Sequence, residues 1–171
     1  MSGTLTLTAG DLIVRFGRVL KVLGIKDKKV AFSPRFASQK TGGLTYSIPL
    51  KNIAGSNYRR IVTKDKLKSL FGSILGKPIP VEEPDTVAVK SSLGGNNLTE
   101  TFTVIKALWS EKKSKSGTLA GGKLSLYQQA LEQAVEEVAA VKGIVPDKAK
   151  LMIMEALKSK QADQAQTQKQ G

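Results

Sequence analysis

The chain has 171 residues, 40% of them hydrophobic, and a formal net charge of +13. It contains no cysteine and no histidine, which excludes disulfides, thiolate nucleophiles, zinc fingers and Ser-His-Asp triads. This length suffices for one ordinary domain or for two small ones.

The positive charge lies mainly in the N-terminal half. The first 80 residues hold 15 of the 27 Lys and Arg residues but only 3 of the 14 acidic ones, a net charge of +12. Repulsion of this size opposes compaction and is offset by a polyanion or by an acidic protein surface. The same residues also fit a merely solvated face, so the charge alone leaves both interpretations open.

Short β-strands separated by turn-forming residues are predicted in the first 62 residues. Their alternation leaves the basic residues, such as Lys21 and Lys26, largely on the solvent side. Strands this short and this close together are typical of a small β-barrel of the Tudor or SH3 type. The predicted strands are Leu5–Thr8, Leu12–Phe16, Val19–Ile25, Lys29–Phe32, Thr45–Ile48 and Tyr58–Val62.

A helix is predicted after Thr63, a good N-cap residue, and it ends at Gly76. We expect it to pack on the barrel, so that residues 1–76 form the N-terminal domain. Residues 77–98 are rich in Pro, Ser, Gly and Asn, which predicts a linker, with one strand conceivable at Thr86–Val89.

Apolar residues recur at helical spacing through the second half. Three helices are predicted, at 99–115, at 125–142 and from Pro146 onward, with Gly143 closing the second. Residues 99–160 are therefore expected to form an all-α domain, and the Gln-rich residues 161–171 a disordered tail. The expected fold class is α+β.

Nothing in the sequence predicts catalysis. An enzyme would have to use Asp, Glu, Lys, Ser or Tyr alone, and no convergent nucleophile and base is visible. We therefore expect no catalytic residue, no metal ligand and no cofactor. No apolar stretch approaches the length of a membrane span, and no leader is visible, so a cytoplasmic, bacterial protein without a membrane partner is expected. We also expect a monomer.

Trp109, the single tryptophan, ends an apolar stretch and precedes a cluster of lysines. A lone tryptophan is usually a core residue. Beside lysines that hold phosphates, it could instead wedge between base pairs from the minor groove. The residue type alone does not decide between these alternatives.

Several segments, in the same order along nearly the whole chain, resemble the CarD/CdnL-type bacterial transcription regulators, whose polymerase-interacting domain also occurs in the transcription-repair coupling factor. The segments are Thr8–Val14, Thr45–Asn52, the helix at Lys66–Leu75, Trp109-Ser110 with the lysines that follow, Leu119–Gly122, and the last two helical stretches. The sequence departs from the family pattern at Val14–Arg18, where a Pro-x-His-Gly turn is usual, and at Ser47, where a basic residue is common.

The resemblance implies a Tudor-like domain that binds the β subunit of bacterial RNA polymerase, and a helical domain that binds promoter DNA in the minor groove without sequence specificity. It assigns polymerase binding to Arg15, Arg18, Tyr46, Ser47, Ile48 and Pro49. It assigns DNA binding to Trp109, Lys112, Lys113 and Lys115. The implied function is control of open-complex stability.

A second hypothesis explains the basic N-terminal half equally well. A Tudor or KOW-like barrel could bind RNA or a ribosomal surface, with the helices serving as a protein-interaction domain. This hypothesis expects RNA affinity in residues 1–76 and no role for Trp109.

Overall fold

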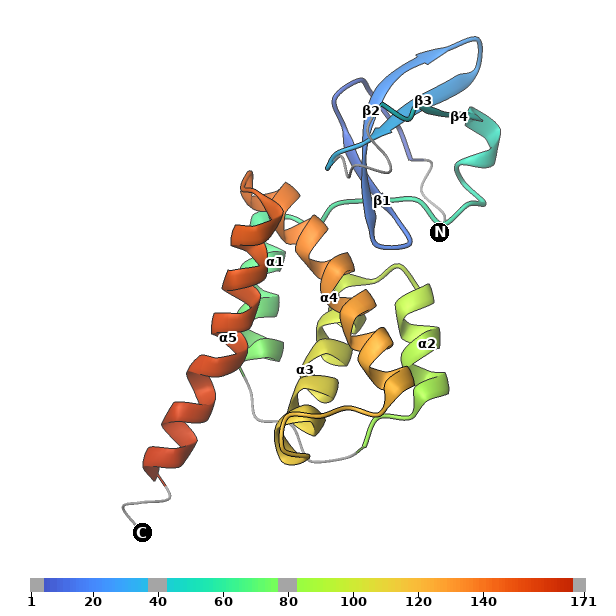
Figure 1. The fold of residues 1–171 in the computed structure, drawn as a ribbon. Helices are drawn as coiled ribbons and strands as arrows, with labels where there is room; N and C mark the ends of the chain where they lie inside the picture. Colours follow the sequence, from blue (N-terminus) through green and yellow to red (C-terminus); the bar gives the residue numbers. More distant parts are fainter. Residues whose placement is uncertain (1–4, 37–42, 77–82, 168–171) are drawn as a thin grey trace.

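A computed structural model describes residues 5–36, 43–76 and 83–167, with side chains as far as residue 158. An antiparallel sheet comes first and a set of packed helices follows, so the fold class is α+β, as predicted (Figure 1). The strands lie in the order β4-β3-β2-β1-β5. Their bounds are β1 Leu12–Arg15, β2 Arg18–Lys26, β3 Lys29–Pro34, β4 Tyr46–Pro49 and β5 Arg59–Arg60.

Two tight hairpins build the centre of the sheet. Phe16 and Gly17 connect β1 to β2 with φ angles of 48° and 75°, and Asp27 and Lys28 connect β2 to β3 with φ angles of 49° and 58°. Paired positive φ angles characterise the two-residue turns whose twist matches that of the adjoining strands. The first turn therefore presents Phe16 at the tip of a rigid hairpin.

The sheet is open, whereas the strand pattern predicted a closed barrel. β4 and β5 are its two end strands and do not pair with each other. Residues 5–8 form no strand, contrary to prediction, although Leu7 is buried in the sheet core with Ile13 and Phe32. β5 has only two residues, too few to close the sheet. Gly42, one of the turn-forming residues between the predicted strands Lys29–Phe32 and Thr45–Ile48, lies outside the described residues.

The helices follow the predicted starts and stops in most places. The Lys66 amide donates to Thr63 Oγ1 over 3.2 Å, so Thr63 is the expected N-cap, and Gly143 ends α4 with a φ of 65°. The 3₁₀ turn η1 spans Leu50–Asn52, and the π-helical turn η2 spans Phe71–Leu75. The α-helices are α1 Lys64–Leu70, α2 Thr86–Gly94, α3 Leu98–Ser114, α4 Gly121–Lys142 and α5 Pro146–Thr167.

The prediction of a linker at residues 77–98 is wrong in its C-terminal part, where the chain forms α2. Asp85 caps this helix by accepting a hydrogen bond from the Ala88 amide over 3.1 Å, and Val89 and Leu93 are buried against the other helices. The conceivable strand at 86–89 is therefore helical. Residues 77–82 lie outside the described part of the chain.

The last helix is also longer than predicted. The backbone of α5 is helical as far as Thr167, although residues 161–171 were expected to be disordered. Alanine and glutamine favour helix, and extending an existing helix needs no new nucleation. Residues 168–171 are not described.

The first helix belongs to the helical core and not to the sheet. Leu67, Leu70 and Leu75 are buried with Phe102 and Ile153 in the core that the helices share. This corrects the expectation that residues 1–76 pack as one domain, because the change from sheet to helical core falls near residue 62.

Polar side chains of the helical part hold the sheet in place. Asn96, between α2 and α3, donates to the carbonyls of Val14 and Asn57 over 3.1 and 2.8 Å. Glu137 on α4 is buried and accepts two hydrogen bonds of 2.7 Å from the Arg59 guanidinium. These contacts hold β1 and the end strand β5 against the helical part.

Glu136 on α4 adds a connection at the β1–β2 turn. It accepts a hydrogen bond from the Val19 amide over 2.9 Å and forms a 3.0 Å ion pair with Arg18. Burial raises the pKa of Glu136 above its ordinary value, and the two contacts only partly offset that rise. α4 therefore positions the sheet residues that line the site described next.

Candidate functional site

A groove of about 630 Å³ lies on the sheet, between the β1–β2 turn and β4. The turn forms one wall with Arg15, Phe16 and Arg18, and β4 supplies residues on the other side. The remaining lining residues are Leu20, Pro34, Thr45, Tyr46, Ser47, Ile48 and Tyr58. Segments that are distant in sequence thus line one groove, with β2 and β3 lying between β1 and β4 in the sheet.

Arg15 is held between two aromatic rings at one side of this sheet groove. Its guanidinium carbon lies 5.1 Å from the centre of the Phe16 ring and 4.9 Å from that of Tyr58. It also donates to the Tyr58 hydroxyl over 3.2 Å, and Tyr58 stacks on the buried Phe32 with ring centres 5.5 Å apart. Arg15 is therefore rigidly placed, which lowers the entropy that a partner must remove on binding.

Large apolar side chains stand exposed around the groove. Phe16 is 50% exposed and Tyr46 is 44% exposed. Aromatic residues and arginine are enriched at protein interfaces. Phe16 also keeps its exposed ring on a left-handed backbone, a conformation that is uncommon outside glycine and concentrates at functional sites.

The structure brings together five of the six residues that were predicted to bind polymerase: Arg15, Arg18, Tyr46, Ser47 and Ile48 all line the groove. Pro49 ends β4 beside them and is not one of the lining residues. The sequence analysis missed Phe16 and Tyr58. A signal for Phe16 was present in the sequence: the pair Phe16-Gly17 lies between two stretches of alternating apolar and polar residues, as expected of a two-residue hairpin turn. Such a turn places Phe16 at the tip of the hairpin.

Trp109 does not lie on the surface. It is 4% exposed and belongs to the helical core together with Leu108 and Phe102. The prediction that it wedges into DNA is therefore not supported by its position, since a wedge must be exposed to reach a base step. The ordinary role of a lone tryptophan, as core, fits this residue.

The three predicted DNA-binding lysines have different surroundings. Lys113 is exposed, with its Nζ 5.2 Å from the centre of the Trp109 ring, and Lys112 is half-buried, with its Nζ 5.8 Å from the Tyr127 ring. Lys115 instead pairs with Glu83 over 2.6 Å and with Glu111 over 3.0 Å. The hydrogen bond to Glu83 is the main cause that raises the pKa of Lys115.

Glu111 is a buried acid at the centre of this cluster. Lys123, which the sequence analysis did not single out, approaches Glu111 to 2.9 Å from the start of α4. Burial alone would raise the pKa of Glu111, but the hydrogen bonds from Lys123 and Lys115 outweigh it and hold the pKa below its ordinary value. Lys123 thus ties α4 to α3 through Glu111, and Lys115 is engaged by Glu111 and Glu83.

Among the described residues, no group of three or more acidic side chains lies close enough together to hold a metal ion. Within the same residues, no helix is both apolar enough and long enough to cross a membrane. The sheet groove is the candidate site because it gathers exposed aromatic rings and guanidinium groups.

Comparison with known proteins adds no assignment: no protein-family model matches the sequence, and no curated protein matches it.

Proposed function

We propose that this protein is a non-catalytic transcription regulator of the CarD/CdnL type, whose sheet groove binds the β subunit of bacterial RNA polymerase. The observation that carries the proposal is the meeting of Arg15, Arg18 and Tyr46 in one groove, because the resemblance had assigned these separate segments to a single partner. The meander that ends in a short fifth strand beside β1 is compatible with a Tudor-like module.

The groove suits a protein partner in two ways. The rings of Phe16 and Tyr46 supply apolar area in a rigid frame, and such anchors contribute most of the affinity of protein interfaces. β4 is also the outermost strand on its side of the described sheet, so an extended segment of the partner could add to it by backbone hydrogen bonds.

We also propose that promoter DNA is bound through lysines and without a wedge. Lys113 and Lys112 lie at the C-terminal end of α3, where Trp109 and Tyr127 support their ammonium groups. Lysine contacts of this kind neutralise phosphates without reading the sequence. A regulator of this kind stabilises the open complex only by the difference in its affinity for the open and closed states.

One observation favours a second function, the binding of single-stranded RNA. Exposed aromatic rings beside arginines are also the platform on which unpaired bases stack, and Phe16, Tyr46 and Arg15 supply both elements. The burial of Trp109 agrees with this alternative, which assigned it no role.

The test is the affinity of the full chain for purified bacterial RNA polymerase β subunit, measured by biolayer interferometry for the unchanged protein, Tyr46→Ala and Leu151→Ala. Leu151 is 62% exposed on α5 and does not line the sheet groove, so its variant controls for the loss of exposed apolar area. We expect Tyr46→Ala to weaken binding about tenfold and Leu151→Ala to leave it unchanged.

The same three proteins are titrated with a labelled single-stranded RNA. RNA binding that depends on Tyr46, without polymerase binding, would establish the second function in place of the first. Polymerase binding that is equally strong in all three proteins would remove the sheet groove from the mechanism.

A further inference from the structure

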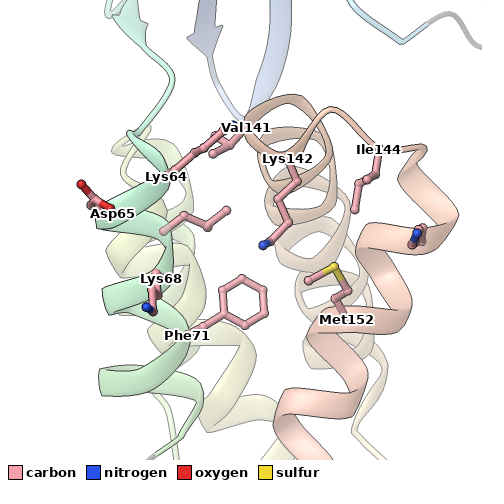
Figure 2. Close-up of a pocket in the computed structure, with 10 residues that line it drawn as sticks. Lys64, Asp65, Lys68, Phe71, Val141, Lys142, Ile144 and Met152 are labelled. Carbon is pink, nitrogen blue, oxygen red and sulfur yellow. The ribbon is translucent and has the colours of Figure 1, made fainter.

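A second groove lies in the helical part of the molecule, where α1 faces the end of α4 and the beginning of α5 (Figure 2). Its volume is about 690 Å³, which is within the range of sites that take up several side chains or a small ligand. It shares no residue with the sheet groove, so the inference that follows does not depend on the proposed function.

The floor of this second groove is apolar. It consists of Leu67, Phe71, Val141, Ile144 and Met152. Leu67 and Val141 are buried, whereas Phe71, Ile144 and Met152 remain half-exposed in the groove. Phe71 is held by an edge-to-face contact with the buried Phe102, with ring centres 5.4 Å apart. The floor is therefore a fixed apolar surface that its own chain leaves partly uncovered.

The rim of the groove is basic. Lys64 and Lys68 stand on α1, and Lys142 and Lys148 stand on the opposite side, at the end of α4 and the start of α5. All four are exposed, and none forms an ion pair within the described parts of the chain. Figure 2 shows Lys142 directed into the groove, while Asp65, the one acid of the lining, points away from it.

We propose that this lysine-rimmed groove binds an acidic amphipathic helix of a partner protein. An apolar stripe of such a helix, with residues spaced by three or four positions, would cover the floor, and carboxylates on both of its flanks would meet the lysines. Charge complementarity selects this occupant, because the lysines of both walls form no ion pair with any described residue. A nucleic acid would satisfy the lysines but would leave the apolar floor in contact with water.

The groove also differs from a membrane-binding surface. Its apolar residues lie at the bottom of a concavity between helices, whereas an interfacial helix inserts a projecting apolar face into the lipid. The shape therefore fits a rod of side chains entering from outside. Since Lys64 and Lys68 are on one wall and Lys142 on the other, the bound helix would lie between the two walls.

The probe is a fluorescein-labelled synthetic peptide of about 15 residues, with Leu and Phe on one helical face and Glu on the others. Its affinity for the full chain is measured by fluorescence anisotropy at physiological salt. A peptide of the same composition in scrambled order controls for the general attraction of an acidic peptide to a chain of charge +13. We expect the ordered peptide to bind at least about tenfold more tightly than the scrambled one.

Two protein variants locate the binding. The double change Lys68→Glu and Lys142→Glu reverses charge on both walls, and we expect it to weaken binding about tenfold or more. The matched double change Lys21→Glu and Lys90→Glu alters the net charge equally at exposed positions outside the groove, and binding should fall by about twofold or less. These exposed positions carry no core packing, so all variants should fold.

Methionine methyl spectra give an independent readout. With ¹³C-methyl methionine, the signal of Met152 should shift on addition of the ordered peptide, because Met152 lines the groove. The proposal fails if both peptides bind equally, if the two double variants weaken binding equally, or if the Met152 signal stays unchanged. Binding of anionic vesicles or duplex DNA, but not the ordered peptide, in a manner that depends on Lys68 and Lys142 would also overturn it and identify the other occupant.

Discussion

At the scale of single residues, Trp109 and Phe16 show how the fold gives two large aromatic side chains opposite positions. Trp109 lies on the inner face of α3 and is 4% exposed, whereas Phe16 occupies the tip of a hairpin and is 50% exposed. The buried ring stabilises the helical core. The exposure of the Phe16 ring to water is unfavourable, and the residue has a left-handed backbone conformation. Its position is therefore consistent with recognition of a partner.

We predict that Trp109→Ala destabilises the protein by about 3–5 kcal/mol, because removing a buried indole leaves a cavity in the helical core. The free energy of unfolding is measured in urea by circular dichroism. Val87→Ala, at a 74% exposed position on α2, is the control and should change stability by less than about 0.5 kcal/mol.

Fluorescence of the unchanged protein provides a second check, since Trp109 is its single tryptophan. A buried indole should be poorly quenched by acrylamide. If Trp109→Ala left stability intact and removed DNA affinity, the wedge hypothesis would be restored and the core assignment would be wrong.

At the scale of the elements, α4 carries two acids whose connections shape the molecule, and α3 carries a third. Glu137 and Glu136 bind the sheet, and Glu111 near the end of α3 binds the first residues of α4 through Lys123. Each acid satisfies groups from a different element, which is how buried charge is tolerated. The helices are therefore positioned by charge as well as by their apolar stripes.

The pKa shifts of Glu111 and Glu136 predict opposite pH dependences. The pKa of Glu111 is lowered, so its contribution to stability is complete above its ordinary value of 4.5 and is lost as the pH falls through the lower folded-state pKa. The pKa of Glu136 is raised by burial, so its favourable contribution is complete below 4.5 and is lost as the pH rises through the folded-state pKa.

Urea unfolding from about pH 3 to pH 7 tests both signs. The free energy of unfolding of Glu111→Gln should fall furthest below that of the unchanged protein at neutral pH and approach it in acid. For Glu136→Gln, the free energy of unfolding should compare most favourably with that of the unchanged protein at neutral pH. Parallel pH curves for all three proteins would contradict the assigned shifts.

At the scale of the whole molecule, the sheet and the helical part are joined by a polar interface in which the backbone of Gly17 lies close against the Gln133 side chain. Gly17 lies against α4, and a Cβ atom there would be 2.1 Å from Gln133 Cγ and 2.6 Å from Gln133 Cβ. Its φ of 75° also disfavours any side chain. Gly17 therefore serves both the hairpin turn and the docking of the sheet.

We predict that Gly17→Ala loosens this docking and costs about 1–3 kcal/mol of stability. Gly24→Ala is the matched control, because no atom lies within 4 Å of its added Cβ, and it should change stability by about 1 kcal/mol or less. Amide exchange of Val19 and Val62, which donate to acids of α4, should accelerate in Gly17→Ala. Equal exchange rates in the two variants would show that the contact does not hold the sheet.

Local sequence patterns were sufficient to predict many of the strands and helices. The alternation in residues 12–34 identified three strands, and Thr63 and Gly143 marked a helix start and a helix end, because capping and turn preferences act within a few residues. The same local signals misassigned 86–94, where Ser and Gly suggested a linker. There, burial of Val89 and Leu93 against distant helices overrides weak propensity.

The sequence by itself determined the α+β class, most element boundaries and the basic excess, since these depend on composition and on neighbours along the chain. Only the tertiary structure decided that the sheet stays open, that α1 joins the helical core and that Trp109 is buried. It also brought Phe16 and Tyr46 into one groove, and Lys68 and Lys142 onto the two walls of another. These facts depend on contacts between residues far apart in sequence, whose energies no local pattern records.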